Sequence, residues 1–130
     1  MAKVYQPMKN NRYYLPKNLY MRTVYLIRDY IRLKEEYDDM LDESFSGEGL
    51  GGSTISDPTP VRAAKVYECA RCIRAITDAL SVIPEDYRSG VFENIVFGER
   101  YPDYAAVSTW SRNRSRFIYE VARNMNWISK

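Results

Sequence analysis

Four large apolar residues recur at intervals of seven in the first third of the chain: Leu19, Leu26, Leu33 and Met40. This spacing places side chains on one face of an α-helix, so it predicts a long helix with one buried stripe from residue 16 to residue 43. Pro16 suits the first turn, where a proline removes no helical hydrogen bond. No segment shows the alternation of apolar and polar residues typical of a strand. We therefore expect an all-α fold with about four helices.

Two stretches of the sequence lack a helical period. Residues 1–15 are basic and rich in tyrosine, which indicates an extended arm. Residues 44–59 are rich in glycine and serine, which is typical of a flexible linker, and we expect a mobile loop over residues 44–57. The glycines do not form a phosphate-binding loop, because no GK[ST] motif follows them and the charges nearby are acidic. The linker joins two helical parts of one small domain of 130 residues.

Proline and glycine mark the limits of the helices after the linker. Pro60 suits a first helical turn behind a capping Thr59, and Gly98 suits a helix end. The expected helices are Pro60–Ile83, Glu85–Phe97 and Ser108–Trp127, the last of them capped by Ser108 or Thr109. The stripe expected to be buried on the first of these is Val66, Ala70, Ile73, Thr77 and Leu80.

The residue types that carry most enzyme chemistry are scarce in this chain. It contains no histidine, which excludes a Ser-His-Asp triad, a Cys-His pair and an imidazole metal site. Cys69 and Cys72 form one CxxC motif inside an expected helix, whereas a zinc site needs further ligands and a redox motif opens a helix after a strand. We expect two buried, reduced thiols, no metal or other cofactor, and no enzymatic activity.

Charge is segregated along the chain, although the formal net charge is only +2. The stretch from Met1 to Arg32 carries seven basic residues and one acidic residue, and the stretch from Glu35 to Asp57 carries eight acidic residues and no basic one. From Ser111 onward the charges are again basic, opposed only by Glu120. Such segregation directs a polyanion to one face of a protein.

The sequence also bears on location. No apolar run approaches the roughly 20 residues that span a bilayer, and the N-terminus lacks the apolar stretch of a signal peptide. We expect a cytoplasmic protein of a bacterial host cell with no membrane partner.

The segment "STWSRNRSRFIYEVARNMNW", residues 108–127, gathers arginines between aromatic residues. On a helical wheel, Trp110, Phe117 and Val121 fall on one side, which we expect to be core. Arg112, Arg116 and Arg123 fall on the opposite side, where guanidinium groups can reach phosphates or guanine edges. An ordinary solvated helix face produces the same pattern, so the stripe alone does not decide between the two interpretations.

Arg114 points to the apolar side of the same wheel. We expect a structural role for it. It either extends past Trp110 to reach water or pairs with an acid, for which the sequence offers Asp103, Glu85 and Asp86.

The segment "IPEDYRSGVFENIVFGERYPDYAAVSTWSRNRSRFIYEVARNMNWI" resembles the C-terminal part of phage-encoded RinA/ArpU-type late transcription regulators, a part that is itself similar to region 4 of sigma-70 factors. The matching elements are Pro84 with its two following acids, Phe97 with Gly98, and "SRFIYEVARNMNWI" at residues 115–128. The resemblance implies a helix-turn-helix whose last helix enters the major groove of double-stranded DNA. The sequence departs from that pattern, because "ERYPDYAAV" is too short for a scaffold helix and a turn. Either the motif is contracted or Val91–Phe97 is the scaffold helix.

A DNA-binding last helix assigns roles to particular residues. Its leading end is where recognition helices meet base edges, and its later turns meet phosphate. The expected DNA contacts are Thr109, Ser111, Arg112, Asn113, Arg116 and Arg123, with phosphate contacts on the arm from Lys3, Lys9 and Arg12.

Two functions are consistent with these features. The first is a phage or prophage transcription regulator that binds duplex DNA, with host RNA polymerase and a second copy of the chain as further expected partners. The second is a protein-interaction module without DNA binding, which the twelve tyrosines and the acidic residues from Glu35 to Glu43 would serve. Salt-dependent binding to duplex DNA discriminates between them.

Overall fold

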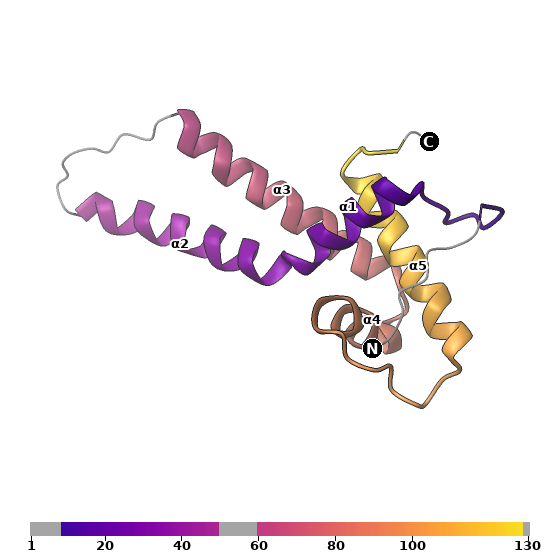
Figure 1. Ribbon diagram of the computed structural model, residues 1–130. Helices are drawn as coiled ribbons and strands as arrows, with labels where there is room; N and C mark the ends of the chain where they lie inside the picture. Colours follow the sequence, from indigo (N-terminus) through magenta and orange to yellow (C-terminus); the bar gives the residue numbers. More distant parts are fainter. Residues whose placement is uncertain (1–8, 50–59, 129–130) are drawn as a thin grey trace.

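The computed structural model describes residues 9–49 and 60–128, and every regular element in these ranges is helical. The all-α fold is therefore confirmed. The helices are α1 (Lys17–Arg28), α2 (Tyr30–Gly49), α3 (Pro60–Val82), α4 (Glu85–Phe97) and α5 (Val107–Asn124) (Figure 1). None of these helices is long and apolar enough to cross a membrane in the part of the chain that the structure describes.

The long first helix of the prediction is interrupted at Asp29. This residue has φ −83° and ψ 0°, and its N–H shares the carbonyls of Tyr25 and Leu26, each at 3.1 Å. The expected single helix is therefore wrong, and two helices replace it. The break lets α1 pack against α4 and α5 while α2 packs against α3. A straight helix of that length would not lie against both groups, so tertiary packing overrides the seven-residue pattern.

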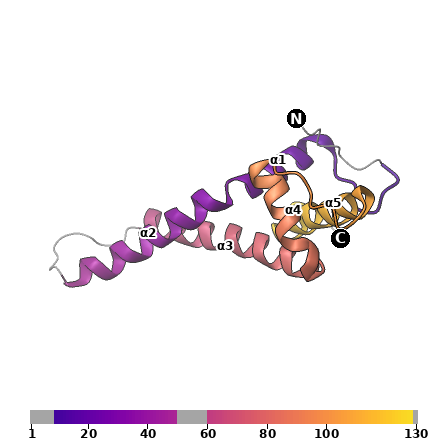
Figure 2. The same cartoon turned by 90° about the horizontal axis from the view of Figure 1, so that it is seen from below.

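The helices form two parts. α2 and α3 run side by side as a long antiparallel hairpin that projects from the rest of the molecule in both views (Figures 1 and 2). α1, α4 and α5 pack at the base of the hairpin, where the C-terminal part of α3 joins them. Tyr30 meets Phe92 edge-on at 5.4 Å between ring centroids, and Arg28 donates a 3.1 Å hydrogen bond to the Ile95 carbonyl. These two contacts fix the start of α2 and the end of α1 on α4.

The core lies at this base. Trp110, Phe117 and Val121 of α5 are completely buried, as the helical wheel predicts. Val91 and Ile95 of α4 belong to the same apolar cluster. The expected inward face of the last helix is therefore confirmed.

The buried stripe that we expected on α3 is wrong, because the helix turns a different face to the core. Thr77 is exposed, and the other predicted residues are only partly buried. The buried residues of this helix are Cys69, Cys72, Ala75, Ile76 and Ala79. α3 contacts α2, α4 and α5, and four of its five buried residues are alanine or cysteine. The apolar residues of α3 are spread around most of its circumference, so periodicity alone does not identify its inward face.

Several helix ends differ from the expected ones. α2 continues to Gly49, so a mobile loop from residue 44 is wrong for residues 44–49, and Thr59 and residues 50–59 lie outside the described residues. α5 begins at Val107 after an Ala106 cap that makes no side-chain hydrogen bond, so neither Ser108 nor Thr109 caps it. α3 and α4 begin at Pro60 and Glu85 as predicted, and Gly98 ends α4 with φ 70°.

The end of α5 also comes earlier than expected. The helix stops at Asn124, and Asn126 has the left-handed φ of 64°. Trp127, which we expected to be helical, instead stacks on the Arg22 guanidinium of α1 at 3.8 Å from the ring centroid. A cation–π contact of this kind stabilises the turn that ends the helix.

Candidate nucleic-acid interface

Residues 98–106 connect α4 to α5 and are held in place by hydrogen bonds and a ring stack. The Tyr104 hydroxyl donates a 2.5 Å hydrogen bond to the Asp86 carbonyl, and Asn94 Nδ2 donates to the Glu99 carbonyl at 2.9 Å. The Tyr101 ring stacks on Trp110 with centroids 5.3 Å apart and planes 7° from parallel. The connection therefore holds the start of α5 in a fixed place relative to α4.

Gly90 sets how closely α4 approaches α5. A Cβ atom at this position would lie 2.6 Å from Cζ3 of Trp110 and 3.1 Å from the Pro102 ring. A Cβ contact of 2.6 Å is shorter than real side chains make, so the α4 backbone approaches the indole this closely because residue 90 is glycine.

Arg114 is buried and joins three elements through neutral groups. Its Nη1 donates to the Tyr20 hydroxyl of α1 at 2.7 Å, and its Nε donates to Asn94 Oδ1 of α4 at 3.1 Å. Its structural role agrees with our expectation, but the expected partners are wrong. It neither reaches water past Trp110 nor pairs with an acid within the described part of the chain, and its Nη2 has no hydrogen-bond partner there. Burial raises the pKa of nearby Tyr101, and the positive charge of Arg114 acts against that rise.

The leading end of α5 carries two accessible residues among the predicted DNA contacts. Arg112 and Ser111 are exposed, and the Arg112 guanidinium makes no hydrogen bond or ion pair with any residue in the described ranges. Thr109 and Asn113 are only partly exposed, and Asn113 Nδ2 donates to the Thr109 carbonyl at 3.1 Å. The Asn113 amide is thus already engaged with its own helix.

The middle of the predicted arginine stripe is partly covered, which corrects the expectation of a continuous exposed face. The arm residue Tyr13 packs on Tyr119, with ring centroids 5.5 Å apart. Arg116, one turn before Tyr119, is partly buried, and its Nε is buried without a hydrogen-bond partner among the described residues. The wheel placed Arg116 outward, but it contained no information on where the arm lies.

Arg123 is exposed but not free. Its Nη1 lies 3.5 Å from Glu120 Oε1, and 47% of the arginine side chain is accessible against 14% of the glutamate. The pair sits one turn apart on α5, so the carboxylate offsets part of the arginine's charge at this end of the helix.

The arm supplies positive charge beside α5. Leu15 is 1% exposed and attaches the end of the arm to the core. Lys9 and Arg12 are exposed, and the Arg12 guanidinium lies 5.3 Å from the centroid of Tyr13. Lys3 lies outside the described residues.

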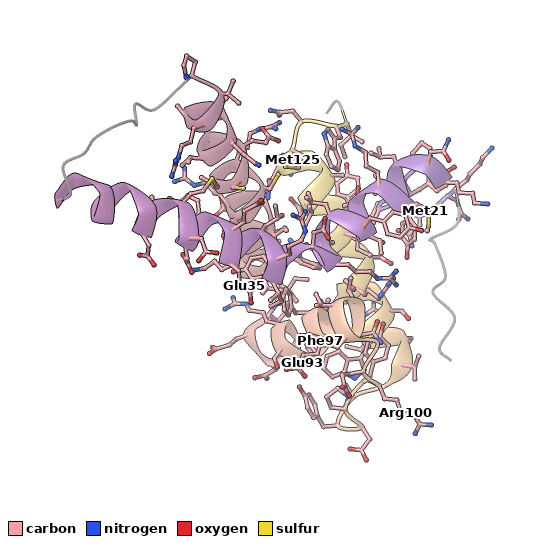
Figure 3. All side chains as sticks on the ribbon, turned by 60° about the vertical axis from the view of Figure 1, so that its left-hand side comes forward. Met21, Glu35, Glu93, Phe97, Arg100 and Met125 are labelled. Carbon is pink, nitrogen blue, oxygen red and sulfur yellow. The ribbon has the colours of Figure 1, made fainter. Side chains whose placement is uncertain are left out.

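A groove beside the end of α5 was not expected from the sequence. It has a volume of about 400 Å³ and is lined by Tyr67, Ala70, Arg71, Arg74, Ala75, Asp78 and Asn124. Arg71 Nη2 donates to the Met125 carbonyl at 2.9 Å, and Asn124 Nδ2 donates to the Ala75 carbonyl at 3.0 Å. Figure 3 shows Met125 at the end of α5, beside α3. The sequence signal for it is a pair of arginines three residues apart on one helix, Arg71 and Arg74.

The two cysteines lie in the hairpin and not at this surface. Both are buried and not bonded to each other. Cys69 Sγ lies 3.8 Å from Glu36 Oε1, and Cys72 Sγ lies 3.7 Å from Glu68 Oε2. Burial and the Glu68 carboxylate raise the pKa of Cys72 to about 11, and burial raises that of Cys69. Both thiols therefore stay protonated at neutral pH and are poor nucleophiles.

Comparison of the chain with protein-family models, with curated proteins and with solved structures finds no match. The resemblance to RinA/ArpU-type regulators accordingly stays a prediction.

Proposed function

We propose that this protein is a phage or prophage transcription regulator that binds duplex DNA through α5. The observation that carries the proposal is Arg112. Its guanidinium is exposed and has no partner among the described residues, and it stands at the leading end of a helix whose other face is completely buried. A guanidinium in this setting is free to make the paired hydrogen bonds that guanine offers in the major groove.

The rigidity of α5 supports the same proposal. Arg114 ties the helix to α1 and α4, and the Tyr101–Trp110 stack ties it to the connection before it. A reading helix held in this way keeps its backbone in a fixed position, so little backbone entropy is lost on binding.

The accessible strip of α5 is bounded on both sides. The arm flanks it at Tyr119, and α3 flanks it through the Asn124 hydrogen bond to Ala75. We propose that α4 is the scaffold helix of a helix-turn-helix with a long connection. Of the two alternatives that the sequence left open, this is the one in which Val91–Phe97 is the scaffold helix and the motif is not contracted. The exposed Lys9 and Arg12 then lie close to the backbone of the same duplex and strengthen binding to all sequences.

The proposal is tested with the purified protein and duplexes taken from its own genomic neighbourhood, in a gel-shift assay. Arg112→Ala should weaken binding to the preferred duplex by about 1–3 kcal/mol and relax the preference at one base pair. The matched control is Lys65→Ala, which removes one positive charge from an exposed position on α3 in the hairpin. Equal binding by Arg112→Ala and the control, or no binding by the unaltered protein, rejects the proposal.

A specific feature favours the second candidate, a protein-interaction module. The projecting hairpin presents Glu35, Asp39 and Asp42 of α2 on an accessible surface, and Ile31 and Leu41 of the same helix are also exposed. An acidic, partly apolar helix on a projecting arm suits a basic protein surface. This function is favoured if the protein binds host RNA polymerase but not duplex DNA, and if Glu35→Lys/Asp39→Lys abolishes that binding.

A further inference from the structure

The groove between α3 and the end of α5 is built from both helices. Arg71 of α3 donates a hydrogen bond to the carbonyl of Met125, the residue that follows α5, at 2.9 Å, and Asn124 of α5 donates to the Ala75 carbonyl of α3 at 3.0 Å. These bonds hold the two walls together and place the groove directly beside the last turn of α5. The groove therefore belongs to the same side of the molecule as that turn.

The arginines in this groove have different tasks. The Arg71 guanidinium already has protein partners, because it donates a hydrogen bond to the Met125 carbonyl and forms an ion pair with Glu68 at 3.3 Å. Arg74 is exposed, and its guanidinium forms no ion pair or hydrogen bond with any residue in the ranges that the structure describes. Arg74 is thus the available cation of the groove.

The neighbouring arginine of α5 is less available. Arg123 adjoins Asn124, which lines the groove, but Glu120 lies 3.5 Å from it and offsets part of its charge. An anion approaching this end of α5 meets in Arg74 a guanidinium without a carboxylate partner. Tyr67, which is 69% exposed, adds a hydroxyl donor to the same groove.

We propose that this groove binds the phosphodiester backbone of the duplex whose bases α5 reads, with Arg74 as the phosphate contact. The proposal rests on the proposed function of α5 and assigns the phosphate contact at its end to α3, in addition to Arg123. Arginine and tyrosine are common donors to backbone phosphate, and such contacts fix the register of a reading helix without carrying sequence information. Asp78 lines the same groove and repels a phosphate there, so its charge opposes that of Arg74.

The test measures duplex affinity over a salt series for the full chain. Arg74→Gln should weaken binding to preferred and unrelated duplexes alike, and should lower the slope of log affinity against log salt concentration by about one unit. Lys65→Gln on the same helix, outside the groove, should leave the slope unchanged. Asp78→Asn should have the opposite effect to Arg74→Gln and raise affinity at low salt, with the gain fading as salt rises. Helix content by circular dichroism checks that each variant is folded.

The outcomes separate this proposal from the function on which it rests. If the unaltered protein binds duplex DNA while Arg74→Gln keeps its slope, or if Asp78→Asn fails to raise affinity, the groove does not contact phosphate and only the role of α5 stands. If Arg74→Gln weakens binding to one sequence only, Arg74 contacts a base and the proposal is wrong. If the unaltered protein binds no duplex DNA at any salt concentration, the proposed function fails first.

Discussion

Arg114 Nη1 lies 2.7 Å from the Tyr20 hydroxyl, although ninety-four residues separate the two in the sequence. This bond connects the middle of α5 to the first turn of α1. With the Arg114 bond to Asn94, it makes one buried guanidinium the meeting point of three helices. No carboxylate of the described residues balances its charge, so burial of the guanidinium depends on neutral acceptors alone.

We expect Arg114→Ala to lower the free energy of unfolding by about 2–4 kcal/mol. The substitution leaves a cavity and deprives Tyr20 and Asn94 of a buried partner. Arg114→Met should cost clearly less, because an apolar chain of similar length fills the space without a buried charge. Urea unfolding of both variants measures the difference. If Arg114→Ala unfolds at the same urea concentration as the unaltered protein, the arginine does not have this structural role.

Gly90→Ala should destabilise the packing of α4 on α5 by about 1–3 kcal/mol. The new methyl would lie 2.6 Å from the Trp110 indole, so one of the two must shift. Ser89→Ala, at the neighbouring exposed position of α4, should change stability by less than about 0.5 kcal/mol. Thermal melts of the two variants give the comparison, and equal melting temperatures would contradict the close contact.

Two phenylalanines provide a test of the core. Phe117 is completely buried, whereas Phe97 is 59% exposed. Phe117→Ala should cost about 3–5 kcal/mol in the free energy of unfolding, and Phe97→Ala far less. Chemical denaturation distinguishes the two. A larger loss for Phe97→Ala would mean that the inward face of α5 is misassigned, and Arg112 and Arg123 would then not lie on its outward face.

The pKa of Cys72 predicts a loss of stability in alkaline solution. The folded protein raises this pKa from 9.0 to about 11, so folding favours the protonated thiol. The resulting stabilisation is complete below pH 9 and is lost as the pH rises toward 11. Cys72→Ala removes this contribution, so its stability relative to the unaltered protein should improve across that window. A constant difference between the two proteins from pH 8 to pH 11 would contradict the raised pKa.

The sequence predicted the parts of this fold that depend on local chemistry. Proline, glycine and the acidic start of α4 placed the beginnings of α3 and α4 correctly, and the wheel of α5 identified its buried face. The wrong predictions depend on contacts between distant segments. Asp29 breaks the first helix because α1 and α2 pack on different partners, and α3 is rotated because it touches several helices at once. No local pattern contains that information.

The predictions for the candidate site also divide into those that depend on local pattern and those that depend on contacts between distant segments. Periodicity separated Arg112 from Arg114 by direction, and that separation is confirmed. Two features were not predictable: the packing of Tyr13 on Tyr119 and the partners of Arg114. Both depend on where the arm and α1 lie in three dimensions. The groove containing Arg74 likewise exists only once α3 meets the end of α5.

The duplex-DNA affinity of Arg112→Ala/Arg116→Ala over a salt series tests whether α5 is the DNA-binding helix. The control is Lys34→Ala/Lys65→Ala, which removes the same charge from exposed positions on the hairpin. We predict strong, salt-dependent binding by the unaltered protein and by the control, and weaker binding with a slope reduced by up to about two units for the arginine variant. Binding by the arginine variant that matches the control at every salt concentration, or no binding by the unaltered protein, would contradict the assignment of α5 as the DNA-binding helix.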